Sequence, residues 1–469
     1  MGSSEPDDQE RSDPAQRRYA WRVLALNVVV VSQPALNAGM LNLALPDITR
    51  QTSATNTQIT LVVSAYWLVS TVLLLSFGRL ADMLGRRRLY IAGIATFTLA
   101  CAGCAAATSA DVLILMRILQ AVGAAAIIVN SSALLTDAFP RDLLSTGMGI
   151  SASIFSAFGL AGPVVGGALV TRFGGQAVFW FSVPFGVIGL VGALLLLRPH
   201  LPTTRQSFDY AGAGLSAVAL TGLLVFLSGG QSWGWENPVG LGVATFSAGM
   251  LVAFVLFERG RRHPLLDLSL FTVWSRAAAY VCHGLVAVSD FSIALLLSLY
   301  FQRVMGLTAL DAGLRLVPST VGALVAAPLA GRLARRYESR VLSSWGVALH
   351  AAALLGLVFA FPAHPPYWVT GVCLAAIGVG TGLFTTPNTH AIMASVEPDR
   401  RGVAGAVRST IANVAGLTGT ALVLAVVAGP SVAARVSASS FQVAGLVLFA
   451  CCVVGTFLSL ARGRQHDPQ

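Results

Sequence analysis

Fourteen apolar stretches, each about 20 residues long, constrain what this 469-residue chain can fold into more than any other feature. Because an α-helix rises about 1.5 Å per residue, each stretch is long enough to cross the hydrocarbon core of a bilayer. Charged residues make up only 11% of the chain, whereas soluble domains contain about 25%. A soluble globular, disordered or coiled-coil protein is therefore excluded, and we predict an all-α polytopic membrane protein. The fourteen transmembrane helices are expected near residues 22–45, 58–78, 88–107, 112–135, 145–171, 176–197, 210–229, 238–257, 277–301, 310–331, 341–361, 367–390, 402–428 and 441–461.

The basic residues indicate how the chain is oriented in the membrane. All 30 of them are arginines, against 20 acidic residues. The joints on the side of the N-terminus hold 23 arginines, the opposite joints hold four, and three lie within expected spans. Because arginine collects on the cytoplasmic side of membrane proteins, we expect both termini in the cytosol. Topology thus explains the net charge of +10, and nucleic acid is not an expected partner.

The two ends of the chain carry no transmembrane stretch. Residues 1–21 are mostly polar, contain charges of both signs and lack the apolar segment of a secretory signal. We expect a disordered cytosolic tail over these residues and a second, short cytosolic tail over residues 462–469.

A compact motif follows the second expected span. Residues 78–88 read GRLADMLGRRR, in which Gly78 and Gly85 permit a tight turn between closely packed helices. Asp82 stands at a helix end, where a carboxylate can cap the N-terminus of a neighbouring helix. A degenerate copy, GRLARR, begins at Gly331, about half the chain later, as expected for a parallel internal repeat. The alternative interpretation of residues 78–88 is a merely basic loop.

Two further motifs lie within expected spans. Arg117 begins the segment RILQAVGAA, and an arginine at this depth must face a cavity or a polar partner, unless it reaches the membrane interface. Residues 159–167 read GLAGPVVGG, in which the glycines allow close helix packing and Pro163 bends the helix. A generic glycine-rich packing face is the alternative for this second segment.

Together these motifs resemble those of the major facilitator superfamily, in particular its fourteen-span drug/proton antiporters. Residues 78–88 are similar to the signature loop of the superfamily, residues 113–125 to a motif of its drug exporters, and residues 159–167 to its antiporter motif. Residues 36–46, LNAGMLNLALP, are similar to a further motif of the subfamily, except that Asn37 replaces a membrane-embedded aspartate. Since asparagine cannot carry a proton, the usual acidic site of the first span is absent.

The resemblance implies a major facilitator fold, in which two six-helix bundles rock against each other around a substrate site near the midplane. The bundles would comprise residues 22–197 and 277–461, and residues 198–276 would form a linker with two inserted transmembrane helices. The resemblance further implies that Asp82 caps the cytosolic N-terminus of the thirteenth span, near Gly402. The residues expected to control conformational gating are Gly78, Asp82, Gly85, Arg86, Gly162, Pro163, Gly166, Gly167 and Arg408.

Asp290 is the only carboxylate in the middle of an expected span, and it is our candidate for proton coupling. His283 precedes it by seven residues, which places both side chains on nearly the same helix face, about 10 Å apart along the axis. His283 is therefore a second candidate for proton coupling. The alternatives are an ion pair of Asp290 with Arg315 or Arg408, and a packing role for His283. We interpret His350 as a packing residue.

Polar residues within other spans are candidates for lining the substrate cavity. Hydroxyl and amide groups also join transmembrane helices to one another, so a structural role is the alternative for them. The candidates are Asn37, Gln33, Tyr66, Arg117, Ser153, Ser156, Arg315 and Asn388.

The function that the resemblance implies is export of amphipathic small molecules, such as drugs or antibiotics, by proton antiport across a bacterial cytoplasmic membrane. The cargo, protons and the lipid bilayer would be the partners of a monomeric protein, and the proton gradient would drive transport without a cofactor. The arginines within spans leave the charge of the cargo open. A lipid or siderophore exporter and a non-transporting membrane sensor are alternatives. Neither a metal site nor an enzyme is expected, because the cysteines lack ligand spacing, and the expected spans contain no HExxH motif, no GxSxG motif and no paired carboxylates.

Overall fold

The computed structural model describes residues 14–198, 208–233, 236–261, 264–307, 309–334, 336–360, 366–397, 400–428 and 438–462. Within these ranges the chain is helical and contains no strand. Thirteen helices are long and apolar enough to cross a membrane, and the bent helix α5 supplies a fourteenth span. The predicted all-α architecture with fourteen transmembrane helices is thus confirmed.

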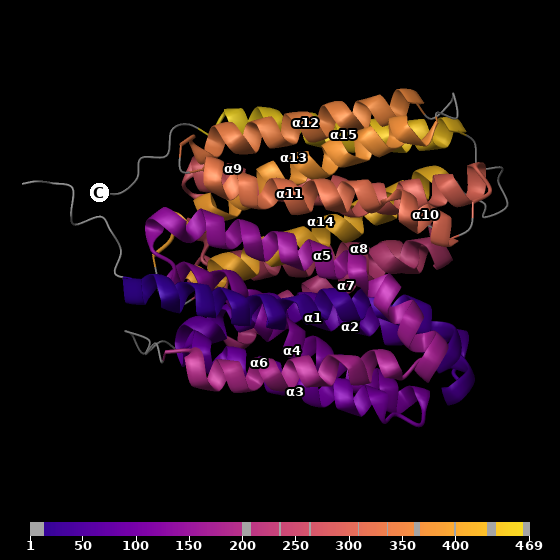
Figure 1. Cartoon of the computed structure of the whole chain (residues 1–469), viewed down its shortest axis with the longest axis horizontal. Coiled ribbons are helices and arrows are strands. Elements are labelled where there is room, and N and C mark those ends of the chain that lie inside the picture. Colours follow the sequence, from indigo (N-terminus) through magenta and orange to yellow (C-terminus); the bar gives the residue numbers. More distant parts are fainter. Residues whose placement is uncertain are drawn as a thin grey trace, which may run out of the picture.

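Two bundles of six spans make up most of the molecule, and Figure 1 displays them one above the other. The first bundle consists of α1 (Pro14–Thr52), α2 (Asn56–Leu84), α3 (Arg86–Ala105), α4 (Ala110–Ala138), α5 (Arg141–Phe173) and α6 (Ala177–Leu196). The second consists of α9 (Trp274–Leu299), α10 (Ala309–Arg315) with α11 (Val317–Leu333), α12 (Ser339–Ala360), α13 (Tyr367–Ala394), α14 (Arg401–Ala428) and α15 (Ala438–Leu460).

Helix α5 bends by about 40° between Gly159 and Val164, the stretch that contains Pro163. The sequence predicted a bend at this proline, because proline cannot donate a backbone hydrogen bond. On either side of it, Gly162 and Gly166 pack directly on α1. A Cβ atom at these positions would lie 3.0 and 2.8 Å, respectively, from backbone atoms of α1. The glycine motif therefore holds α5 against α1 inside the first bundle.

The expected span over residues 310–331 is divided at Leu316 into α10 and α11. Pro318 stands in the first turn of α11, where its missing N–H costs no helical hydrogen bond but prevents α10 from continuing regularly. The preceding span also departs from a simple helix, since α9 continues as a π-helical turn over Tyr300–Val304.

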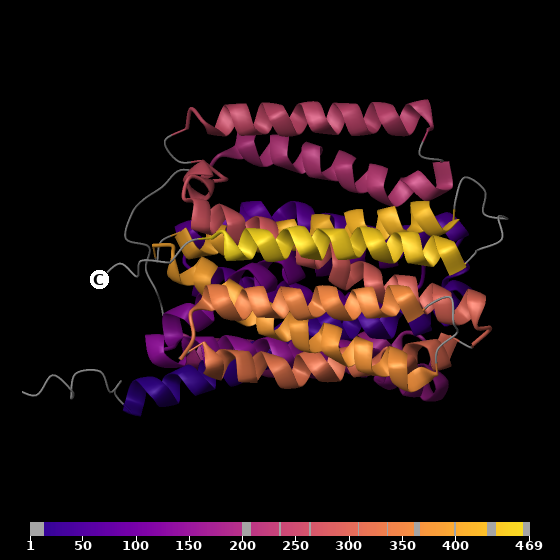
Figure 2. The same ribbon diagram turned by 90° about the horizontal axis from the view of Figure 1, so that it is seen from above.

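The inserted helices α7 (Tyr210–Trp233) and α8 (Pro238–Glu258) form a hairpin. Figure 2 shows this hairpin along one side of the two bundles. Helix α7 packs on α2 and on α14, so it touches one helix of each bundle, whereas α8 packs mainly on α7. The hairpin therefore lies at the periphery and leaves the interface between the bundles to the other helices.

Helix α1 begins and α15 ends at the same end of the molecule, on the left in Figure 2. We call this end the arginine-rich end, because the sequence analysis assigns 23 of the 30 arginines to the side of the N-terminus. Helix α1 starts at Pro14, so residues 14–21 of the expected N-terminal tail are helical. Residues 1–13, 199–207 and 463–469, which belong to the expected tails and linker, lie outside the described residues.

Candidate functional site

A cavity of about 700 Å³ lies between the two bundles at mid-depth. Four helices of each bundle line it: α1, α2, α4 and α5 on one side, and α9, α11, α13 and α14 on the other. Its wall is mostly apolar, aromatic or hydroxyl-bearing. Among the residues that line it, Asp290 is the one carboxylate, Arg408 the one guanidinium and His283 the one imidazole. A cavity of this kind is suited to an amphipathic small molecule.

Asp290 is held by two residues from other helices of the second bundle. The hydroxyl of Thr381 donates to Asp290 Oδ1 at 2.7 Å, and His350 Nδ1 lies 3.7 Å from the same oxygen. Both contacts involve Oδ1, so Oδ2 remains for a group in the cavity. The Asp290 side chain is 29% exposed, whereas His350 is fully buried. Asp290 thus connects the cavity to the interior of the second bundle.

His350 belongs to a short chain of hydrogen bonds. The hydroxyl of Thr381 has a single proton, which it gives to Asp290, so His350 Nδ1 must be the donor to Thr381 at 3.1 Å. In the neutral ring, Nε2 then accepts from the hydroxyl of Ser289 at 2.9 Å. The sequence-based interpretation of His350 as a packing residue overlooked this polar unit. Neither Arg315 nor Arg408 forms the ion pair with Asp290 that the sequence suggested.

His283 and Arg408 form the second polar group in the cavity wall. Arg408 Nη1 lies 3.5 Å from His283 Nε2, and because arginine only donates, Nε2 must be the acceptor. His283 Nδ1 and Arg408 Nε are both buried without a hydrogen-bond partner. Among the described residues, no carboxylate lies within 4.0 Å of Arg408. This pair therefore presents donors that no protein acceptor satisfies.

The other predicted cavity residues divide into two groups. Tyr66 and Ser156 line the cavity, as do both candidates for proton coupling. The remaining ones are not part of its wall. Of these, Ser153 donates to the carbonyl of Gly149, and Asn388 donates to the carbonyl of Ala279. The complete set outside the wall is Asn37, Gln33, Arg117, Ser153, Arg315 and Asn388.

Arg117 forms a buried cluster inside the first bundle instead. Its Nε donates to the carbonyl of Val62 at 3.1 Å, and its Nη1 donates to Asn37 Oδ1 at 3.2 Å and to Gln120. The guanidinium lies 4.2 Å from the ring centroid of Tyr66. Since Arg117 is only 1% exposed, these acceptors and the ring replace water around its charge. Within the described part of the chain this cluster includes no carboxylate.

Replacing Asn37 by aspartate should raise the melting temperature of the purified protein. The new carboxylate would stand 3.2 Å from the Arg117 guanidinium and supply the counter-charge that the cluster lacks. A hydrogen bond between charged groups contributes about 1.5–3 kcal/mol. Thermal unfolding in detergent checks this, with Asn130→Asp as the control. Asn130 is fully buried and, among the described residues, has no cationic hydrogen-bond partner, so that variant should melt lower. An unchanged or lower melting temperature for Asn37→Asp would contradict the prediction.

Arg315 lies at the end of α10, away from the cavity wall. Its guanidinium carbon is 5.2 Å from the ring centroid of Tyr367 and 5.6 Å from that of Phe301. These cation–π contacts give it a packing role where α10 meets α13. The deep positive charges that the sequence suggested for the cavity are therefore reduced to one, on Arg408.

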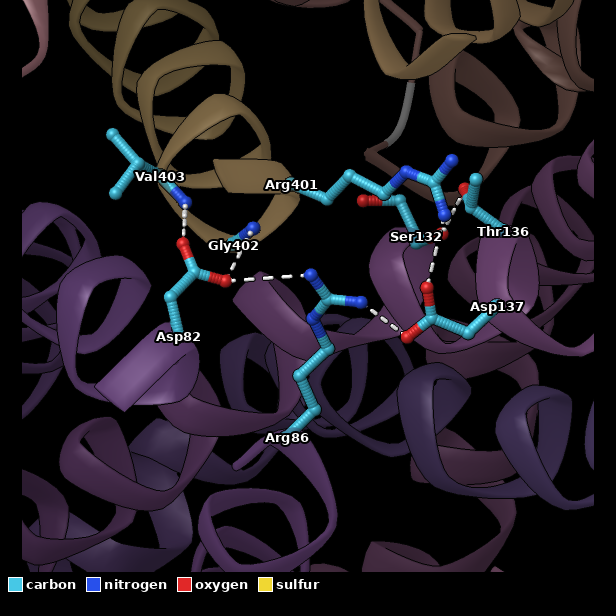
Figure 3. A network of polar contacts seen from close by, with 8 residues as sticks. All are labelled: Asp82, Arg86, Ser132, Thr136, Asp137, Arg401, Gly402 and Val403. Atoms are coloured by element: carbon cyan, nitrogen blue, oxygen red, sulfur yellow. Dashed lines mark hydrogen bonds and ion pairs between the residues drawn. The ribbon is translucent and has the colours of Figure 1, made fainter. Parts of the chain in front are cut away.

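The two bundles are latched at the arginine-rich end, as Figure 3 shows. Asp82 at the end of α2 accepts hydrogen bonds from the backbone N–H groups of Gly402 and Val403, at 3.0 and 3.1 Å. These groups belong to the first turn of α14, where unpaired N–H groups and the helix dipole attract a carboxylate. The cap implied by the sequence motif is thus present. Arg86 Nη2 lies 3.4 Å from Asp82 Oδ1 and supports it.

Asp137 at the end of α4 extends this network. It pairs with Arg86 of the first bundle and, at 3.1 Å, with Arg401 of the second. Figure 3 shows the resulting chain, in which acidic and basic groups alternate from α2 to α14. Each carboxylate thus contacts both bundles.

Small residues bring the bundles into direct contact next to the latch. A Cβ atom at Gly78 would lie 2.5 Å from Ala406 Cβ of α14. Where α5 crosses α11, a Cβ atom at Gly149 would lie 2.4 Å from the carbonyl oxygen of Ala327, and one at Gly331 would lie 2.5 Å from that of Ser145. At these three positions the helices are too close to accommodate even a Cβ atom. The bundles therefore leave no passage here, and the arginine-rich end is closed.

The remaining gating candidates lie at turns or within one bundle. Gly85 joins α2 to α3 with a φ of 90°, a conformation that favours glycine. Gly162, Pro163, Gly166 and Gly167 belong to the contact between α5 and α1 or the turn beside it. Arg408 lies one and a half turns inside α14 from Val403, at the cavity rather than in the latch.

Four residues of these networks were not selected from the sequence. The sequence could have indicated Asp137 and Arg401 as an ion pair, because both are charged residues at helix ends on the same side of the membrane. No such indication exists for His350 and Thr381, since the spacing of residues along one helix does not reveal what faces them on another. They become evident only when α9, α12 and α13 are packed together.

Comparison with known proteins agrees with this architecture. The family model described as Major Facilitator Superfamily matches residues 34–420. The chain is 29% identical to the riboflavin transporter RibZ of Clostridioides difficile, over 86% of this chain and 87% of the relative. It is 30% identical to the methylenomycin A resistance protein of Bacillus subtilis, over 94% of this chain and 91% of the relative.

The fold also matches solved structures. The human organic anion transporter MFSD10 superposes with a TM-score of 0.68 at 14% identity, which covers 95% of this chain and all of the other chain. At this identity the likeness concerns the fold alone, but it agrees with the family match over most of the sequence. The chain belongs to the major facilitator superfamily of membrane transporters.

Proposed function

We propose that this protein exports amphipathic small molecules, such as drugs or antibiotics, in exchange for protons. One observation carries the proposal: Asp290 is the single carboxylate in the wall of a cavity of about 700 Å³ between the bundles. A carboxylate there can bind either a proton or a positively charged group of a cargo molecule. The similarity to the methylenomycin A resistance protein supports an antibiotic as cargo, and the similarity to a riboflavin transporter supports an aromatic one.

Orientation follows from the arginines. With 23 of 30 on one side, the arginine-rich end would face the cytosol of a bacterial cell, with both termini there. The latch between Asp82 and α14 would then close the cytosolic side. In this conformation the cavity would receive protons from outside the cell. The proton gradient supplies the energy without a cofactor, and a monomer contains the complete cavity.

In the proposed cycle, a proton from outside binds Asp290 and displaces the cargo. The bundles then rock, the latch opens, and Asp290 releases its proton to the cytosol before new cargo binds. Thr381, supported from behind by His350, holds Asp290 Oδ1 in place throughout, while Oδ2 exchanges the proton for the cargo. Because the proton and the cargo bind the same oxygen, they exclude each other. This mutual exclusion couples the inward movement of protons to the outward movement of cargo.

Transport by purified protein in liposomes tests the proposal. An imposed pH gradient should drive uphill movement of a lipophilic cation such as ethidium, and Asp290→Asn should reduce this movement to the level of protein-free liposomes. Asp111→Asn is the matched control. Asp111 lies at the start of α4, at the end of the molecule opposite the latch, and in the described structure it accepts a hydrogen bond only from Gln58. Ethidium that binds without moving would indicate a sensor, and gradient-driven movement that persists in Asp290→Asn would exclude Asp290 as the coupling site.

Replacing Thr381 by valine should move the pH at which export is half-maximal upward by about one unit. The hydroxyl of Thr381 donates to Asp290 Oδ1 at 2.7 Å and stabilises the deprotonated carboxylate. A hydrogen bond to a charged group contributes about 1.5 kcal/mol or more, and 1.36 kcal/mol corresponds to one pH unit. Without it, Asp290 keeps its proton to higher pH. Thr385→Val, one turn further along the same cavity wall, should leave the profile in place. Equal profiles for all three proteins would contradict this assignment.

A further inference from the structure

The cavity wall carries two opposite charges that do not neutralise each other. Asp290 pairs with His350 and Thr381, and Arg408 contacts His283, but no ion pair joins Asp290 to Arg408. His283 and Asp290 are separated by seven residues of α9, which corresponds to a rise of about 10 Å on nearly one face. The cavity thus has a positive pole near His283 and a negative pole at Asp290.

The positive pole is electrostatically incomplete. Arginine stays charged in proteins, and a charge removed from water is normally paired with an opposite charge. Arg408 has no carboxylate within 4.0 Å in the described part of the chain, and its Nε is buried without a partner. His283 Nδ1 is a second buried donor without an acceptor. Arg408 itself lines the cavity, so its uncompensated charge forms a site for an anionic group such as a carboxylate.

The negative pole suits a cation in the same way. Oδ1 of Asp290 accepts from Thr381, and Oδ2 remains for a ligand. Between the two poles the wall of α9 consists of Val286 and Ala287, and the ring of Phe291 lies beyond. An apolar or aromatic body therefore fits between the charges.

We propose that the preferred cargo is a zwitterionic amphipathic molecule, whose anionic group binds Arg408 and His283 and whose cationic group, about 10 Å away, binds Asp290. This inference rests on the proposed proton antiport and specifies its cargo. A purely anionic cargo would be repelled by deprotonated Asp290 and favoured by a proton there, which is the reverse of exchange. A zwitterion satisfies Arg408 and still competes with the proton for Asp290.

The test uses one aromatic scaffold in four charge states. Ciprofloxacin carries a carboxylate and a piperazinium at opposite ends of a planar ring system. Its ethyl ester keeps only the cation, its N-acetyl derivative keeps only the anion, and the doubly modified compound is neutral. Binding is measured from the fluorescence of the compounds with protein in nanodiscs, and proton-driven efflux is measured in liposomes.

Wild-type protein should bind ciprofloxacin about tenfold more tightly than either singly modified compound, as expected for loss of one charged hydrogen bond. Arg408→Gln should bind ciprofloxacin and its ethyl ester equally, and Asp290→Asn should bind ciprofloxacin and the N-acetyl derivative equally. Arg408→Lys, which keeps the charge, should retain part of the preference. Melting curves establish that each variant is folded.

Two results would overturn the inference. One is wild-type protein that binds the ester as tightly as ciprofloxacin, and the other is an Arg408→Gln variant that weakens all four compounds equally, as a structural or chloride-binding arginine would. Proton-driven efflux of the ester without a zwitterion preference would leave the proposed antiport intact and refute this cargo class. A zwitterion preference in binding without proton-driven efflux would support the cargo site and refute the antiport.

Discussion

Replacing Asp82 by alanine should reduce proton-driven export more than tenfold and leave the arginine-rich end open in most molecules. Asp82 accepts two backbone N–H groups of α14, at 3.0 and 3.1 Å, and adds the attraction of a carboxylate to the helix N-terminus. Two hydrogen bonds to a charged group contribute about 3 kcal/mol together, and each 1.4 kcal/mol changes an equilibrium tenfold. Their loss shifts the equilibrium by about a hundredfold toward the state in which the bundles are separated at this end.

Spin labels at Leu84 and Tyr337 would measure this separation. Both residues are exposed, and they lie at the arginine-rich end of different bundles. The distance between the labels should be short and narrowly distributed in wild type, and longer in Asp82→Ala. Asp47→Ala is the control, since in the described part of the chain Asp47 pairs only with Arg50, at the opposite end of α1. If the distribution in Asp82→Ala matches that of wild type, the cap does not hold the bundles together.

The spans could be predicted from the sequence because the information for them is local. A stretch of about 20 apolar residues has one stable arrangement in a bilayer, whatever its neighbours are. The bend at Pro163 and the turn at Gly85 are equally local, since each follows from the geometry of one residue type. Asp82 was placed at its cap because a whole motif, rather than a single charge, identified the contact.

The polar partners could not be predicted because they depend on how the helices are rotated and displaced against one another. Asp290 lies within α9, but the sequence left Arg315 and Arg408 as its possible partners, whereas Thr381 and His350 are the groups beside it. Arg117 has the same depth-based signal as a cavity residue, yet α4 turns it inward against Asn37. Hydropathy specifies that a polar group is within the membrane, but not which neighbour satisfies it.

Replacing Gly149 by leucine should yield a folded protein that no longer exports. A Cβ atom at this position would lie 2.4 Å from the carbonyl oxygen of Ala327, and a backbone atom cannot turn aside as a side chain can. Because Gly149 and Ala327 belong to different bundles, the molecule relieves the overlap by separating the bundles at the arginine-rich end. Overpacking costs about 1–3 kcal/mol or more, enough to favour that separated state by tenfold or more.

The position of each glycine determines whether its replacement by leucine holds the bundles apart or prevents the protein from folding. A Cβ atom at Gly378 would lie even closer to a carbonyl oxygen, 1.8 Å from that of Ser319, but both residues lie within the second bundle, so Gly378→Leu should fail to fold. Gly159→Leu on α5 is the matched control for Gly149→Leu, because no atom of the other described elements lies within 4 Å of a Cβ atom there, and it should export normally. Size-exclusion profiles, label distances at the arginine-rich end and liposome transport separate these outcomes. An aggregated Gly149→Leu protein, or one that exports like Gly159→Leu, would show that the α5–α11 crossing is not the surface at which the bundles part.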